Sequence, residues 1–172
     1  MKRHWTIDPE VTFLNHGSFG ACPRAVQELQ AELRAEIERN TMAFFARGLE
    51  ARLDSAREAL AEFVGAPPGE LAFVSNASTG SSTVLRSLPF EADDEILLTD
   101  HAYNAVRTTV DHVITRSGAK AVVASVPFPL GSPDQVVDAV LARVSPKTKL
   151  ALLDHVTSAT GMVLPIERLV RE

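Results

Sequence analysis

Short apolar runs alternate with longer amphipathic stretches along most of this chain of 172 residues. A short apolar run is typical of a buried strand, whereas apolar residues at spacings of three and four are typical of one face of a helix. Strands and helices alternate in this way along a chain whose parallel strands are joined by helical crossovers. We therefore expect an α/β fold, a three-layer sandwich with a mostly parallel sheet.

Two helices are predicted before the first strand. Pro23 stands where a first helical residue is expected, and apolar residues follow it at helical spacing as far as Ile37. The same spacing resumes between Leu49 and Phe63, and the sequence Gly-Ala-Pro-Pro-Gly over residues 65–69 ends that helix. These amino-terminal helices precede the layered part of the chain.

The layered part is predicted to contain strands with polar segments and helices between them. A loop of small polar residues is expected over 75–82, followed by a helix that runs to Leu88. A capping box with proline at the first helical position predicts another helix start at Ser132 and Pro133. The expected strands cover residues 71–74, 96–98, 121–126 and 150–153.

Charge and cysteine content exclude several classes of protein. Seventeen Lys and Arg residues stand against 22 Asp and Glu residues, a net charge of −5, and no basic run is present, so nucleic acid is not an expected partner. The single cysteine, Cys22, cannot form an internal disulfide, and we expect a cytoplasmic protein. No segment approaches the roughly 18 apolar residues of a membrane-spanning helix. No metal-binding motif is present, so no metal is expected.

Three polar clusters, at residues 76–80, 100–104 and 154–158, stand at the carboxyl ends of predicted strands. Those ends meet at one edge of a parallel sheet, where ligands of such folds bind. The first cluster opens a helix, so its backbone N–H groups and the helix dipole favour an anion such as phosphate. A serine-rich N-cap without a ligand explains this cluster equally well. Glycine-rich nucleotide-binding motifs are absent.

The other two clusters carry aromatic and titratable side chains. His101 and Tyr103 directly follow a strand and suit stacking on a planar ring, although a lone histidine is more often structural. Asp154 and His155 beside Ser158 suggest a hydrolase triad. That triad is disfavoured because neighbouring side chains on a strand point to opposite faces, and no G-x-S-x-G motif is present.

Four ordered segments carry a resemblance to a known family. They are Phe-Leu-Asn-His-Gly-Ser-Phe-Gly (13–20), Phe-Val-Ser-Asn-Ala-Ser-Thr-Gly (73–80), Asp-His-Ala-Tyr-Asn (100–104) and Asp-His-Val-Thr-Ser-Ala-Thr-Gly (154–161). With these segments, the chain resembles the amino-terminal half of class V aminotransferase-like enzymes, which depend on pyridoxal phosphate and have fold type I. It is most similar to the isopenicillin N epimerase-like subgroup, and also similar to C–S lyases and cysteine desulfurases.

The resemblance implies a role for residues in each segment. His101 would be the catalytic residue that stacks on the cofactor ring, with Tyr103 as the competing catalytic residue. Ser158 would approach the phenolic oxygen of the cofactor. The cofactor phosphate and the substrate carboxylate would be held by two further sets of residues. These are Ala77, Ser78 and Thr79 for the phosphate, and Asn15, His16 and Ser18 for the carboxylate.

The resemblance also implies how the chain is organised. Residues 1–48 would form an amino-terminal loop and helical segment, and residues 49–172 the first part of an incomplete large domain that binds pyridoxal phosphate. The family forms homodimers, and the aromatic patch at residues 42–48 suits either an interface or a small core. The family lysine that forms the Schiff base lies further downstream, and none of the chain's lysines matches it. They are Lys2, Lys120, Lys147 and Lys149.

We therefore expect the amino-terminal part of a longer enzyme that acts on an amino-acid substrate and is inactive as this chain alone. Its reaction would be epimerisation, C–S cleavage or desulfuration. The alternative is a non-catalytic α/β domain that binds a different phosphate-bearing ligand, since a fold alone does not establish a function.

Overall fold

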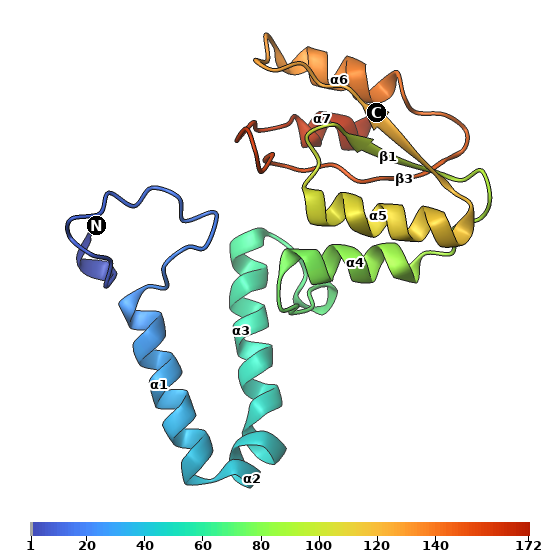
Figure 1. Ribbon diagram of the computed structural model, residues 1–172. Helices are drawn as coiled ribbons and strands as arrows, with labels where there is room; N and C mark the ends of the chain where they lie inside the picture. The colour runs from blue at the N-terminus through green and yellow to red at the C-terminus, as the bar shows by residue number, and fades with distance from the viewer. Residues whose placement is uncertain (1) are drawn as a thin grey trace. The chain divides into compact units, whose positions relative to one another are not determined.

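The computed structural model describes residues 2–172 and divides the chain into two compact units. The first unit ends at Phe73 and the second extends from Val74 to Glu172. Figure 1 shows the helices and strands of both units. The expected division after residue 48 concerns the domains of a whole enzyme and stays a prediction.

The first unit is helical. Helix α3 ends where Gly65 adopts a left-handed conformation with φ 72°, which glycine reaches without strain. The two predicted helices are confirmed as α1 and α3, although Pro23 is the N-cap of α1 and not its first residue. The helical elements are η1 (Lys2–His4), α1 (Arg24–Arg39), α2 (Thr41–Ala43), η2 (Phe44–Gly48), α3 (Leu49–Val64) and η3 (Pro68–Glu70).

Arg52 of α3 links α3 to η2 and to α1. Its guanidinium lies 5.1 Å from the centre of the Phe44 ring in η2 and also forms an ion pair of 2.5 Å with Glu36 of α1. Phe44 is buried, whereas the neighbouring Phe45 is 52% exposed. No residue of α1 within the described chain is buried, and Val26 is among those left exposed.

The second unit is a three-layer α/β sandwich, which confirms the predicted fold class. Its sheet has the strand order β2-β1-β3, with β1 parallel to both neighbours. Leu97 at the centre pairs with Val122 on one side and Ala151 on the other. The elements are α4 (Ala77–Ser87), β1 (Glu95–Thr99), α5 (Asn104–Ser117), β2 (Lys120–Ala124), α6 (Pro133–Leu141), β3 (Thr148–Ala151) and α7 (Ile166–Arg171).

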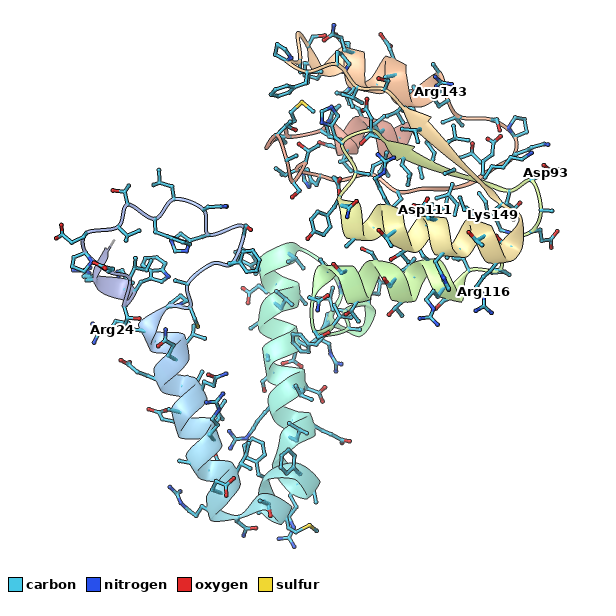
Figure 2. The ribbon with its side chains drawn as sticks, viewed as in Figure 1. Arg24, Asp93, Asp111, Arg116, Arg143 and Lys149 are labelled. Carbon is cyan, nitrogen blue, oxygen red and sulfur yellow. The ribbon has the colours of Figure 1, made fainter. Side chains whose placement is uncertain are left out.

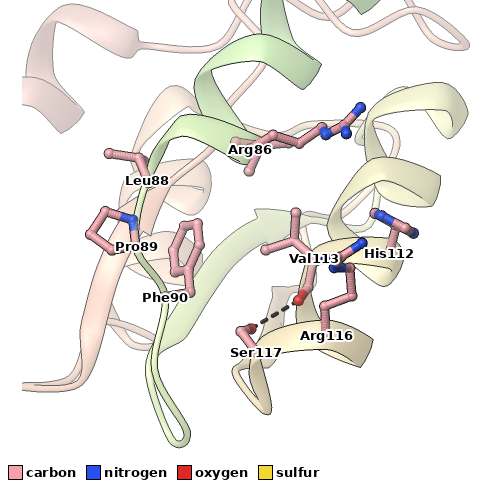
Figure 3. Close-up of a pocket in the computed structure, with 9 residues that line it drawn as sticks. Arg86, Leu88, Pro89, Phe90, His112, Val113, Arg116 and Ser117 are labelled. Atoms are coloured by element: carbon pink, nitrogen blue, oxygen red, sulfur yellow. Dashed lines mark hydrogen bonds between the residues drawn. The ribbon is translucent and has the colours of Figure 1, made fainter.

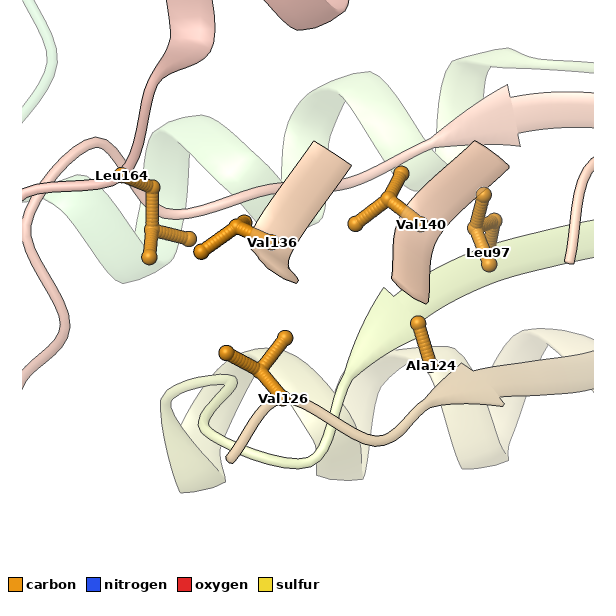
Figure 4. Close-up of a cluster of buried hydrophobic side chains, with 6 residues drawn as sticks. All are labelled: Leu97, Ala124, Val126, Val136, Val140 and Leu164. Carbon is orange, nitrogen blue, oxygen red and sulfur yellow. The ribbon is translucent and has the colours of Figure 1, made fainter. Parts of the chain in front are cut away.

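The two faces of this sheet bury different helices because successive side chains of β1 point to opposite sides. Ile96 and Leu98 pack against Leu85 of α4 and against Val110 and Val113 of α5. The opposite face packs against α6 and the segment that leads into α7 (Figure 4). That second cluster consists of Leu97, Ala124, Val126, Val136, Val140 and Leu164.

Two predictions for the residues on either side of the boundary between the units were wrong. Residues 71–74 are not a strand, because the described chain offers them no partner strand. Residues 75–82 are not a loop, because α4 already begins at Ala77, where the Asn76 side chain caps the helix. Strand β3 begins two residues earlier than predicted, at Thr148, although Leu152 N–H still donates to Leu97 O at 2.8 Å.

The core cluster around α6 leads to a stability prediction. Val136→Ala removes two buried methyl groups and leaves a cavity, so we expect the free energy of unfolding to fall by about 1.5–3 kcal/mol. Val144→Ala is the matched control, because Val144 is 52% exposed. Urea denaturation measures both changes, and equal losses for the two variants would contradict this account of the core.

Candidate functional site

Helices α4 and α5 run parallel and begin at the same edge of the sheet. The hydroxyl groups of Ser82 and Thr109, each in the second turn of its helix, lie 3.0 Å apart. Helix α5 starts shortly after β1 ends at Thr99. Both helix N-termini therefore lie at the carboxyl edge of the sheet, as expected for the ligand site of a parallel fold.

The first turn of α4 can accept an anion. The Asn76 side chain accepts a hydrogen bond from the backbone N–H of Thr79 at 2.8 Å, and the Asn76 carbonyl accepts from Gly80 N–H at 3.1 Å. Within residues 2–172, the backbone N–H groups of Ala77 and Ser78 have no acceptor. Two unpaired donors at the positive end of a helix dipole suit a phosphate group.

Hydroxyl groups continue from this turn along α4. Ser78 is half-buried, and Thr79 accepts a hydrogen bond from Ser75 Oγ at 3.2 Å, which leaves its own hydroxyl hydrogen free to donate. A hollow of about 590 Å³ lies beside them. Its lining residues are Ser78, Thr79, Ser82, Thr83, Arg86 and Ser87.

Asp100 ties the end of β1 to the segment after β2. Its carboxylate accepts hydrogen bonds from Val126 N–H at 2.9 Å and from Ser125 Oγ at 2.8 Å. Partial burial raises the pKa of Asp100, but these hydrogen bonds outweigh the burial, so the pKa lies below its usual value. The next residue, His101, is thereby placed at the carboxyl edge.

His101 is held firmly, whereas Tyr103 is not. His101 Nε2 lies 3.0 Å from Val126 O, Nδ1 lies 3.4 Å from Thr160 Oγ1, and the Phe128 ring centre is 6.3 Å away. Only 14% of the His101 side chain is exposed. Tyr103 is 47% exposed at the N-cap of α5. The contact with Thr160 brings the second polar cluster against the turn that follows the third cluster.

Sequence patterns did not single out Thr157 in the third cluster or Thr160 just after it. Thr157 is buried and shares a hydrogen bond of 2.7 Å with Thr160, while Ser158 between them is exposed. Asp154 Oδ2 is buried without a hydrogen-bond partner in the described chain, and burial raises the pKa of Asp154. Two signals could have identified Thr157 and Thr160: their spacing of three, and their place in the 154–161 segment that carries the resemblance.

The predicted substrate-binding residues belong to the first unit. His16 packs its ring between those of Trp5 and Phe13, with centre distances of 5.3 and 4.8 Å. Asn15 O accepts a hydrogen bond from Ser18 N–H at 3.3 Å, and all three predicted residues are exposed. Their proximity to the clusters of the second unit stays a prediction.

A separate pocket of about 370 Å³ lies where α4 and α5 end (Figure 3). Arg86 and Arg116, which line it, stand in the last turns of these helices. Cations in that position offset the negative end of the helix dipole, which explains both arginines without a ligand. The pocket lies toward the amino edge of the sheet, away from the three polar clusters.

Within residues 2–172, no three His, Cys, Asp or Glu side chains gather as metal ligands would. No helix there combines the length and the hydropathy that crossing a bilayer requires.

The lowered pKa of Asp100 predicts a pH dependence of stability. The folded state binds this proton less tightly than the unfolded state, so Asp100 stabilises the fold above its unfolded pKa, and this contribution is lost as the pH falls through the folded pKa. We expect Asp100→Asn to lose less stability than the wild type below about pH 4. Urea denaturation across this range measures the difference, with Asp111→Asn on α5 as the control. An unchanged acid slope for Asp100→Asn would contradict the prediction.

Known proteins are similar to this chain over nearly its whole length. The isopenicillin N epimerase of Amycolatopsis lactamdurans is 40% identical over 170 residues, which cover 97% of this chain and 42% of that protein. The L-cysteine desulfhydrase of Arabidopsis thaliana is 27% identical over 175 residues, which cover 94% of this chain and 38% of that protein. The chain thus spans less than half the length of these relatives.

Solved structures of other proteins contain the same fold as this chain. The complex of the cystine C–S lyase C-DES with its reaction product cysteine persulfide superposes with a TM-score of 0.84 at 26% identity, covering 95% of this chain and 43% of that one. A C-DES mutant with glycine covalently linked to its PLP cofactor has a TM-score of 0.81. The model of the aminotransferase class-V family matches residues 12–172. The resemblance noted from the sequence is therefore confirmed, and the chain belongs to the aminotransferase class-V family.

Proposed function

We propose that this chain supplies the phosphate cradle and the ring-stacking face of an enzyme that uses pyridoxal phosphate to act on an amino acid. The observation that carries the proposal is the pair of unpaired N–H groups at Ala77 and Ser78, at the same sheet edge as His101. When bound, pyridoxal phosphate stabilises negative charge that develops at the substrate α-carbon. Family membership supports the proposal, and so does the C-DES mutant structure in which glycine is covalently linked to the PLP cofactor.

The phosphate would be held by residues of the first turn of α4. Ala77 and Ser78 offer backbone N–H groups, and Ser78 and Thr79 offer hydroxyl donors. The Thr79 N–H is already used by Asn76, so Thr79 would contribute only through its side chain. Charge-assisted hydrogen bonds of this kind orient the whole ligand as well as bind it.

The ring would lie against His101, whose side chain is fixed by Val126 and Thr160. Ser158 is exposed on the adjoining turn and would offer its hydroxyl to the phenolic oxygen. Tyr103 remains the competing stacking residue, because its exposed ring stands at the start of α5.

Three lysines of the second unit stand at the opposite edge of its sheet from the proposed cradle. Lys120 pairs with Asp93, Lys147 lies 4.0 Å from Asp93, and Lys149 pairs with Asp94 at 2.8 Å. All three stand where β2 and β3 begin, at the amino edge of the sheet; Figure 2 labels Asp93 and Lys149. This placement supports the expectation that the chain alone lacks the lysine needed for turnover.

The finer parts of the proposal concern the whole protein. Relatives named as an epimerase and as desulfhydrases support an amino-acid substrate and leave epimerisation, C–S cleavage and desulfuration open. Asn15, His16 and Ser18 would face the substrate carboxylate. We further propose that the protein forms a homodimer whose interface includes the exposed Phe45 of the 42–48 patch, and that it is cytoplasmic.

The phosphate cradle can be tested with pyridoxine 5′-phosphate. This probe has no aldehyde, so it cannot label the exposed lysines. We expect weak binding to the chain, with a Kd of about a micromolar or higher. Ser78→Ala should weaken binding at least about tenfold, because one hydrogen bond to a charged group contributes about 1.5–3 kcal/mol. Isothermal titration calorimetry measures the affinities.

Three comparisons complete this experiment. Ser87→Ala is the matched control, because Ser87 stands at the other end of α4 and donates to Thr83 O. Pyridoxine without phosphate should bind more weakly than the phosphorylated probe. Equal binding of ribose 5-phosphate would favour the alternative of a domain for another phosphate-bearing ligand. An unchanged affinity for Ser78→Ala would refute the cradle.

The stacking residue can be identified from the probe itself. A side chain that faces the pyridine ring shifts the ring-proton resonances of bound pyridoxine 5′-phosphate, and leucine at that position removes the shift. We expect His101→Leu to change these resonances and Tyr103→Leu to leave them unchanged. Proton NMR of the probe measures both. The reverse result would assign stacking to Tyr103, and no change in either variant would make the whole 100–104 segment structural.

A further inference from the structure

Four hydrogen bonds connect the backbone of Met162 to that of Val126 through three side chains. The backbone N–H of Met162 lies 2.9 Å from Thr157 Oγ1, and Thr157 Oγ1 lies 2.7 Å from Thr160 Oγ1. Thr160 Oγ1 lies 3.4 Å from His101 Nδ1, and His101 Nε2 lies 3.0 Å from Val126 O. We call this series the threonine relay.

The chemistry of its two ends sets the direction of every bond in the relay. A carbonyl oxygen only accepts, so His101 Nε2 must donate to Val126 O and must carry the hydrogen. In the neutral imidazole, Nδ1 then has a lone pair and accepts from the Thr160 hydroxyl. Thr160 therefore accepts from the Thr157 hydroxyl, and Thr157 accepts from Met162 N–H. Each of the three side chains therefore donates one hydrogen bond and accepts one, while Met162 N–H only donates and Val126 O only accepts.

The reversed direction fits the structure less well. If Nδ1 carried the hydrogen, Thr160 would accept from it and donate to Thr157. The Thr157 hydroxyl would then have only Met162 O, at 3.5 Å, as its acceptor. His101 Nε2 would also present a lone pair to the lone pairs of Val126 O. The carboxylate of Asp100 offers no substitute, because its Oδ1 is 3.7 Å from Nε2 and already accepts from Val126 N–H.

The turn that carries the threonines is itself fixed by the backbone. Thr157 N–H donates to Met162 O at 2.9 Å, and Gly161 N–H donates to Thr157 O at 3.0 Å. Gly161 has φ 64°, a left-handed conformation that a residue with a side chain adopts only with strain. Thr157 is 2% exposed, so its hydroxyl cannot exchange this partner for water. The turn therefore gives Thr160 a defined place against the imidazole.

We propose that Thr160, oriented by Thr157, is a positioning residue that holds His101 as the Nε2–H tautomer with both ring nitrogens occupied. His101 then meets a ligand with the face of its ring and not with a nitrogen atom. It acts as a stacking surface, and proton transfer falls to other groups. The relay stands on the geometry of this chain alone, whereas its role in stacking rests on the proposed function.

Nitrogen NMR of the chain without any cofactor tests the relay. Long-range proton–nitrogen correlations of the ¹⁵N-labelled protein at neutral pH distinguish the two tautomers, and His101→Gln assigns the signals. We expect a protonated Nε2, a hydrogen-bonded lone pair on Nδ1, and a ring N–H that exchanges slowly with water. A protonated Nδ1, or a rapidly exchanging mixture, in the wild-type chain would overturn the proposal without any variant.

Two variants then isolate Thr160. Thr160→Val removes the donor to Nδ1, so the Nδ1 resonance should move toward that of a free lone pair. Exchange of the Nε2–H with water should rise roughly tenfold as the ring loses one of its two hydrogen bonds. Thr160→Ser keeps the hydroxyl and should retain the wild-type signals even if the valine variant does not fold. Thr115→Val, an exposed threonine on α5 that donates to Asp111 O, is the control.

The outcomes separate the relay from the proposed function. Unchanged Nδ1 and N–H signals in a folded Thr160→Val variant, or lost signals in Thr160→Ser, would refute the role of Thr160. Failure of the chain to bind pyridoxine 5′-phosphate would refute the phosphate cradle and leave the tautomer measurement intact. A shifted tautomer with intact probe binding would refute the relay alone.

Discussion

The second unit depends on strand β1 being paired on both sides and buried on both faces. Its backbone bonds to β2 and β3, while Leu97 and Leu98 supply opposite cores. Because β1 is held by neighbours on both sides and by packing on both faces, the residues that follow it have a defined position. Asp100 then bonds to Val126 beyond β2, so the loop after the neighbouring strand is tied to the same point. The 100–104 cluster and the segment after β2 therefore both derive their positions from β1.

Local patterns predicted the parts of this fold that local physics determines. The alternation of apolar runs predicted β1, and the capping box at Ser132 predicted α6. Residues 71–74 have the composition of a strand, but strand formation needs a partner, which no local pattern reveals. The start of α4 was missed because serine and threonine suit both loops and first helical turns. The contact between His101 and Thr160 joins residues 59 positions apart, so only the folded sheet brings it about.

Relatives named for different reactions share this part of the chain. A cofactor that stabilises negative charge can serve any of these reactions, and the protein selects one by orienting the bond that breaks. In the proposed function, the α4 cradle and His101 hold the cofactor, which every such reaction needs. Selection among reactions then falls to groups that face the substrate. This division explains why family membership does not by itself identify the reaction.

The ion pairs at the amino edge of the sheet have a chemical consequence for an aldehyde. An aldehyde is attacked by a neutral amine and not by an ammonium ion. The hydrogen bond from Lys120 to Asp93 raises the pKa of Lys120. This amine therefore holds its proton more tightly than a free lysine does and is a poorer nucleophile. A reactive carbonyl compound that approaches the start of β2 would meet an ammonium group paired with a carboxylate, which slows the attack on its carbonyl carbon.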